Sequence, residues 1–187
     1  MLIKSILLEK CLAKDERSIH ELYRLCFSMM KSISMRYQQN EADVNEAINL
    51  GFLKVIQNLH TYNNSNSFEG WYKRILVNTN IDIYRKSKRH QERILYVEVL
   101  DEHNIPSNEI SAPNVKYSYD SLLNLIKNLP PMTRQVFNLF AIDGYAHKEI
   151  AEILKISPGT SKWHVSDARK KLRSMLVEKS NPEIVAK

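Results

Sequence analysis

The chain has 187 residues, of which 43% are hydrophobic, and this composition supports folded cores and excludes a disordered protein. Its 4 glycines and 6 prolines, without recurring alternating apolar runs, disfavour a sheet protein and predict an all-α fold. A formal net charge of +6 favours a polyanionic partner, but charge alone does not separate nucleic acid from an acidic protein or a membrane surface.

The N-terminal residues MLIKSILLEK are apolar over too short a stretch for a signal peptide or a membrane span. We therefore expect a cytoplasmic protein that does not insert into a membrane. Cys11 and Cys26 lack a second cysteine or a histidine at ligand spacing, which favours buried thiols over a disulfide or a zinc site. No nucleophile, base or Gly-rich phosphate loop accompanies the scattered histidines, so we expect no catalytic site, no metal and no cofactor.

Two amphipathic helices are predicted in the N-terminal half. The first runs from Asp15 to about Asn40, and its inward stripe consists of Ile19, Leu22, Tyr23, Cys26, Phe27, Met30, Ile33 and Tyr37. The second runs from about Asp43 to Leu59, and Asp43 suits its start because a carboxylate matches the positive end of the helix dipole. Its inward stripe consists of Val44, Ile48, Phe52, Val55 and Leu59.

A neighbouring face of the second helix mixes carboxylates with leucines: Asp43, Glu46, Leu50, Leu53 and Gln57. Such a mixture is typical of a surface that binds another protein. Alternatively, Leu50 and Leu53 widen the core stripe, and the sequence gives the two interpretations equal weight.

Residues 60–70 are polar and predict a surface loop, which leads into a helix from about Trp71 to Arg89 with a basic end. Aromatic residues lie among the cations: Tyr62, Phe68, Trp71, Tyr72 and Tyr84. Rings that stack on bases, beside cations that follow the backbone, form a surface for single-stranded nucleic acid. The alternative is that Phe68 and Trp71 anchor the loop in the core.

Residues 94–119 are acidic, contain two prolines and lose helical periodicity, which predicts a linker. The chain then divides into an N-terminal helical domain (1–93), the linker, a C-terminal domain (120–178) and a tail (179–187). In the C-terminal domain we expect a short helix that ends before Pro130, a second helix capped by Thr133, and a turn at Asp143-Gly144.

Residues 146–173 predict a helix-turn-helix. Ser157 is placed to cap its second helix and Pro158 to open it. The inward face consists of Ser161, Val165, Ala168 and Leu172, and the outward face of Gly159, Trp163, Ser166, Asp167, Lys170 and Arg173. With Lys162, Arg169 and Lys171 the outward side is basic, as phosphate binding requires, although similar hairpins occur in ordinary helical bundles.

The run from Leu125 to Leu176 contains the pieces LP, R-x-V-F, G-Y, E-I-A, I-S-x-G-T and A-R-K-K-L. The N-terminal half contains D-x-x-E from Asp43, F-L-K-V from Phe52, and W-x-x-x-I-x-x-N-x-x-x-D-x-x-R from Trp71. In both parts, over roughly residues 16–178, the sequence resembles the extracytoplasmic-function sigma factors of the sigma-70 family.

The resemblance implies a sigma subunit that is not itself an enzyme. Its partners would be core RNA polymerase, through the clamp helices of the largest subunit, promoter DNA in double- and single-stranded form, and an anti-sigma factor. The polymerase contacts would be Asp43, Glu46, Asn49, Leu50 and Leu53. Contacts with the opened −10 strand would be Asn64, Phe68, Trp71, Asn78, Asp82, Arg85 and Arg89. Contacts with the −35 duplex would be Gly159, Thr160, Lys162, Trp163, Ser166, Asp167, Lys170 and Arg173.

The chain departs from the family pattern at Asn49-Leu50, where Gln-Glu is usual, and at Ser161, Trp163 and Asp167 in the recognition helix. We expect a more apolar polymerase contact from the first and altered promoter preference from the others. Two rival functions are a helix-turn-helix regulator that acts without polymerase and an interaction protein that sequesters a regulator. The first leaves the 71–89 helix without a role, and the second does not need the basic outward face.

Overall fold

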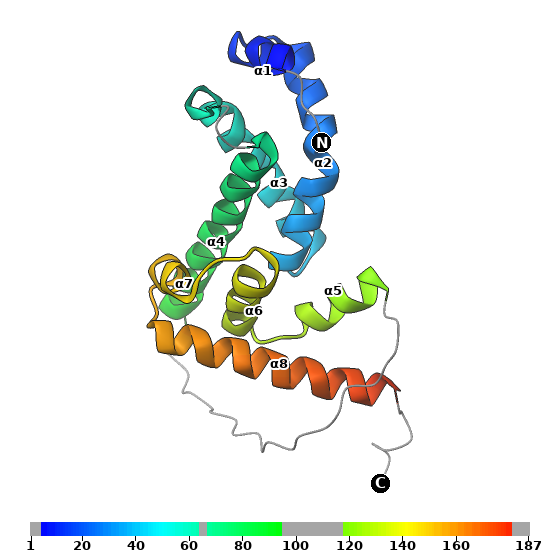
Figure 1. Ribbon diagram of the computed structural model, residues 1–187, viewed down its shortest axis with the longest axis vertical. Helices are drawn as coiled ribbons and strands as arrows, with labels where there is room; N and C mark the ends of the chain where they lie inside the picture. The colour runs from blue at the N-terminus through cyan, green and yellow to red at the C-terminus, as the bar shows by residue number, and fades with distance from the viewer. Residues whose placement is uncertain (1–4, 64–66, 95–117, 181–187) are drawn as a thin grey trace. The chain divides into compact units, whose positions relative to one another are not determined.

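The computed structural model describes residues 5–63, 67–94 and 118–180, apart from the side chains of 89–94, 119–120 and 178–180 (Figure 1). The regular elements in these ranges are all helices, so the predicted all-α class is confirmed. The chain divides into two compact units, Met1–Lys88 and Arg89–Lys187. The predicted linker at 94–119 falls almost wholly on residues outside the description, as does most of the predicted tail. None of the described helices is both long and apolar enough to cross a membrane.

The first unit contains α1 (Ser5–Leu12), α2 (Glu16–Tyr37), α3 (Glu41–Asn58), the 3-10 turn η1 (Leu59–Thr61) and α4 (Phe68–Ile94). Helix α2 begins as predicted, because the Asp15 carboxylate accepts a hydrogen bond from the Ser18 N–H at 2.8 Å. Helix α3 begins earlier than predicted. Its cap is Asn40, whose side-chain oxygen accepts from the Asp43 N–H at 2.8 Å, so Asp43 lies inside the first turn.

The core of this unit forms where the apolar stripes of α2 and α3 meet α4. Leu22 and Cys26 on α2, Val55 on α3 and Tyr72 on α4 are fully buried. The Tyr72 hydroxyl donates to the Cys26 carbonyl at 3.2 Å, which satisfies the phenol inside the core. Cys11 is buried as well, so the prediction that both cysteines pack as small apolar residues is confirmed.

A buried amide network ties α4 to the end of α2. The Gln38 side-chain amide donates to the Asn80 oxygen at 2.9 Å, and the Asn80 amide donates to the Leu76 carbonyl at 2.9 Å and to the Ser34 hydroxyl at 3.4 Å. The three polar side chains are almost fully buried. Since a buried amide without partners is costly, this network favours one register of α4 against α2.

Helices α3 and α4 approach each other closely at Gly51. A Cβ atom at this position would overlap the side chain of Leu76, which is itself fully buried. The absence of a side chain at Gly51 therefore permits the close packing of the two helices.

The second unit contains α5 (Tyr119–Lys127), α6 (Pro131–Phe137), the π-helical turn η2 (Asn138–Ile142), α7 (His147–Leu154) and α8 (Pro158–Ser180). The prediction that Thr133 caps a helix is wrong. Helix α6 already begins at Pro131, where a missing N–H costs nothing, and Thr133 is buried within its first turn. The predicted turn lies at Gly144, whose φ of 78° suits a glycine.

Helix α8 packs on α5, α6 and α7 around a small apolar core. The fully or almost fully buried residues of this core include Leu123, Leu125, Val136, Leu139, Ile150 and Ala168. The core fixes which face of α8 turns inward.

Candidate nucleic-acid interface

Helix α8 begins where its sequence predicts. The Ser157 hydroxyl accepts a hydrogen bond from the Thr160 N–H at 2.9 Å, and Pro158 is the first helical residue. Helix α7 ends at Leu154, and the capping residue Lys155 adopts a left-handed φ of 56° and turns the chain toward α8. A helix-turn-helix therefore spans α7 and α8.

The inward face of α8 is as predicted, with Ser161, Val165 and Ala168 buried. Most of the predicted duplex contacts are exposed: Gly159, Thr160, Lys162, Trp163, Ser166 and Arg173. Trp163 presents 60% of its surface, an unusual exposure for the largest apolar side chain. Lys170 is half-buried at the edge of this face.

Asp167 does not point outward, and that prediction is wrong. Only 14% of its side chain is exposed. One carboxylate oxygen accepts from the Thr133 hydroxyl on α6 at 3.2 Å, and the other pairs with Lys171 one turn along α8. Helical periodicity places Asp167 at the border of the outward face. Its hydrogen bond with the buried Thr133 hydroxyl turns the side chain toward α6.

Ser161 forms a second polar contact between helices. Its hydroxyl lies 2.9 Å from Nδ1 of His147 on α7, and the His147 ring stacks on Phe140 at a centroid distance of 4.3 Å. The sequence contains no signal for this pairing, because the two residues lie on different helices.

An aromatic cluster forms where α4 begins. The ring of Phe68 lies 5.3 Å from Tyr62, 5.6 Å from Trp71 and 5.8 Å from Tyr72, measured between centroids. Phe68 is only 7% exposed, so the alternative of a core anchor is confirmed for this residue, and its contact with DNA stays a prediction. Trp71 is half-buried and keeps part of its indole accessible. Asn64 lies outside the described residues.

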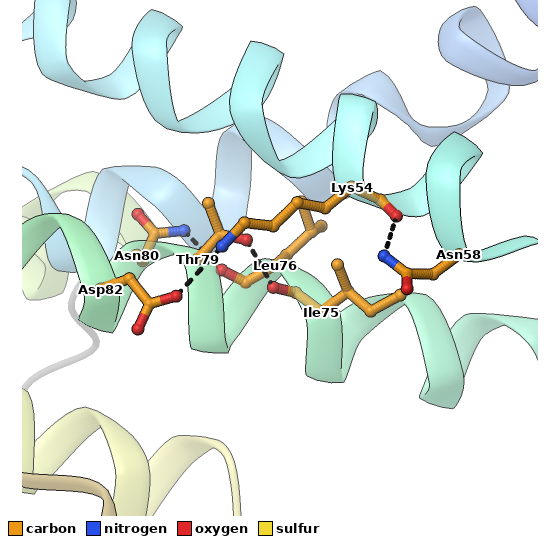
Figure 2. Close-up of polar contacts among 7 residues, drawn as sticks. All are labelled: Lys54, Asn58, Ile75, Leu76, Thr79, Asn80 and Asp82. Carbon is orange, nitrogen blue, oxygen red and sulfur yellow. Dashed lines mark hydrogen bonds and ion pairs between the residues drawn. The ribbon is translucent and has the colours of Figure 1, made fainter.

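Further along α4, Asn78 and Asp82 are exposed and Arg85 is half-buried. Figure 2 shows Lys54 on α3 reaching across to Asp82, with 3.0 Å between the ammonium and the carboxylate. Sequence reasoning missed Lys54, since no spacing rule connects positions 28 residues apart. The side chain of Arg89 is outside the description.

Leu50 and Leu53 on α3 are 39% and 52% exposed, so the interpretation that they widen the core is wrong. Glu46 and Asn49 are exposed beside them. The half-buried Asp43 accepts from the Asn40 side-chain amide at 2.9 Å. This face therefore combines apolar and polar side chains that are accessible to a partner.

Two family models match the chain. Sigma-70 region 2 matches residues 22–90, and sigma-70 region 4 matches residues 119–172, which together make up more than half of the chain. The first match contains α3 and most of α4, and the second contains the helix-turn-helix.

Curated relatives match over most of the chain. The ECF RNA polymerase sigma factor SigE of Mycolicibacterium smegmatis is 27% identical over 169 residues, which cover 86% of this chain and 62% of the relative. The ECF RNA polymerase sigma factor SigW of Bacillus subtilis is 25% identical over 166 residues, which cover 83% of each protein.

A solved structure shares the fold. The sigma factor RpoE from Bartonella quintana, crystallised with the anti-sigma factor NepR, has a TM-score of 0.52 and 16% identity, covering 84% of this chain and 95% of that one. With both conserved regions matched in order, the chain belongs to the sigma-70 family and is a sigma factor of the extracytoplasmic-function type.

Proposed function

We propose that this chain is an alternative sigma subunit that binds core RNA polymerase, recognises promoter DNA and directs initiation with strand opening at the −10 element. It supplies specificity and no catalysis of its own. The observation that carries the proposal is that the two family regions each present accessible residues of the required chemistry: the α3 and α4 faces in one, the basic α8 face in the other.

Strand opening is assigned to the start of α4. Trp71 is half-buried and offers an indole on which a base can stack, and Phe68 packs against that indole with 5.6 Å between ring centroids. The exposed amide of Asn78 can donate to and accept from the Watson–Crick edge of an extruded base. Arg85 would neutralise the phosphates that follow.

Duplex binding is assigned to the outward face of α8. Lys162, Arg169 and Arg173 are exposed cations that suit the phosphates flanking a major groove. Trp163 projects among them and is the side chain placed to meet base edges. We expect this factor to act in the cytoplasm, where polymerase and promoter meet.

Polymerase docking is assigned to α3. Leu50 and Leu53 give this surface an apolar centre, and Glu46 and Asn49 give it a polar rim, the usual arrangement of a protein interface. RpoE is bound by NepR in its co-crystal. By analogy we propose that an anti-sigma protein restrains this factor too.

The test is reconstitution. The purified chain is added to core polymerase, and transcripts are sought from promoter fragments of the source genome. We expect initiation that depends on the chain. A chain that binds duplex DNA but never joins core enzyme would be a plain helix-turn-helix regulator, and one that binds neither would be an interaction protein.

A further inference from the structure

Ser161, Trp163 and Asp167, the residues of α8 for which the sequence predicts altered promoter preference, have different environments in the structure. Ser161 is fully buried against His147, and Asp167 is largely buried against Thr133. Trp163 alone of the three is exposed. Ser161 and Asp167 therefore form contacts between helices, and Trp163 does not share their burial.

Asp167 belongs to a chain of polar contacts that leads to Trp163. The Thr133 hydroxyl has one hydrogen, which it donates to the Asp167 carboxylate at 3.2 Å. The same oxygen lies 2.9 Å from Nδ1 of His164, and because its hydrogen is already used, it accepts from an Nδ1–H. A neutral His164 therefore carries its proton on Nδ1. Burial is the main reason why the pKa of this imidazole lies below its ordinary value.

The His164 ring packs edge-on against Trp163, with 4.9 Å between centroids and 75° between planes. An indole that is 60% exposed has few other neighbours to set its rotamer. The orientation of Trp163 therefore depends on His164, which is held by Thr133 and, through it, by Asp167.

We propose that Asp167 is a positioning residue, which acts through Thr133 and His164 to orient Trp163 toward the methyl group of a thymine in the −35 duplex. The inference rests on the proposed function. Apart from its single Nε1–H donor the indole is an apolar surface, and the C5 methyl of thymine is the apolar feature of a base edge in the major groove. The Asp167 carboxylate, already bonded on both oxygens, is not the group that reads a base.

The experiment begins with the holoenzyme and a random duplex library, from which the wild-type factor selects its preferred −35 sequence. Each thymine of that sequence is then replaced by uracil, which lacks only the methyl. We expect one position at which this replacement weakens wild-type binding about fourfold, the equivalent of one buried methyl. Trp163→Ala removes the sensitivity.

The positioning role is tested with variants that never contact DNA in the proposal. Thr133→Val and Asp167→Asn should each lose most of the methyl sensitivity, and the double variant should lose no more than the stronger single one. Thr133→Ser keeps the hydroxyl and should restore the sensitivity. Glu152→Gln, an exposed site on α7, makes the same charge change as Asp167→Asn and should behave like wild type.

Several results would overturn the proposal. Full methyl sensitivity in Thr133→Val and Asp167→Asn would show that Trp163 needs no support. A changed preference at another base pair in Asp167→Asn, with Thr133→Val unchanged, would make Asp167 a direct reader. A wild-type holoenzyme that selects a duplex without any methyl-sensitive thymine would refute only this inference, whereas one that selects no duplex would refute the proposed function as well.

Discussion

Asn78 and Asn80 lie two residues apart on α4 and have opposite surroundings. Asn78 is exposed, whereas Asn80 is fully buried and bonded to Gln38, Leu76 and Ser34. The same type of side chain therefore stabilises the fold at position 80, whereas at position 78 it is accessible and we expect it to contact DNA. An alanine at each separates the two roles.

We predict that Asn80→Ala lowers the free energy of unfolding by about 2 to 3 kcal/mol, because it leaves the buried Gln38 amide without its acceptor. Asn78→Ala should change stability by less than about 0.5 kcal/mol, as exposed substitutions usually do, yet impair promoter opening. Denaturant unfolding and permanganate detection of unpaired thymines measure the two effects. Equal stability losses in both variants would contradict the assignment.

Cys26 is chemically protected by its place in the core. Burial raises the pKa of its thiol to about 12, with a smaller contribution from Cys11. Because the thiolate is the reactive form, little of it exists at pH 8 in the folded protein.

We predict that a Cys11→Ser variant, which keeps Cys26 alone, reacts with iodoacetamide at pH 8 at least about tenfold more slowly when folded than in denaturant. Raising the pH toward 12 without unfolding should speed the reaction. Mass spectrometry after timed quenching measures the rate. Equal rates in the folded and the denatured protein would be incompatible with a buried thiol.

At the scale of elements, α3 has three faces with different surroundings. One packs on α2, one meets α4 through Gly51 and the Lys54 to Asp82 ion pair, and the third presents Leu50 and Leu53. Since both members of the ion pair are well exposed, at 42% and 57%, it contributes at most about 1 kcal/mol to stability. Asp82 lies on α4 between Asn78 and Arg85, and we expect the ion pair to hold the Asp82 carboxylate in place more than it holds the helices together.

We predict that Leu53→Asp weakens binding to core polymerase about tenfold, because a leucine that becomes buried in an interface contributes about 1.5 kcal/mol or more. Stability should not fall, since the side chain is exposed in the free protein. The matched control is Ile6→Asp on α1, also exposed in the same unit, which should bind like wild type. Fluorescence titration with labelled core enzyme measures both, and identical affinities for the two variants would exclude the α3 surface.

At the scale of the whole molecule, periodicity and capping residues predict most of the helices, because each depends on neighbours along the chain. Asp15, Ser157 and Pro158 begin their helices as expected. Helix α1 was not predicted, since its eight residues are too few to display a clear period.

The candidate site was predictable where a side chain needs only to be exposed, as at Trp163 and Asn78. It was not predictable where the outcome depends on a partner helix. Phe68 was assigned to DNA but is buried among other rings, and Asp167 turns toward a hydroxyl 34 residues away. The surroundings of Phe68 and Asp167 are decided by packing between helices. The sequence of a single helix does not determine that packing.

The close packing at Gly51 restricts which residues can replace Gly51 and Leu76 in related proteins. The space beside it is filled by Leu76, so the volumes at the two positions are coupled. With alanine or serine in place of Gly51, the Leu76 side chain must turn away, a smaller residue must replace it, or α3 and α4 must move apart, and the last change would also separate the two faces to which we assign polymerase and DNA binding. We therefore expect substitutions at these two sites to be coupled, because a side chain added at position 51 is tolerated best when position 76 is smaller.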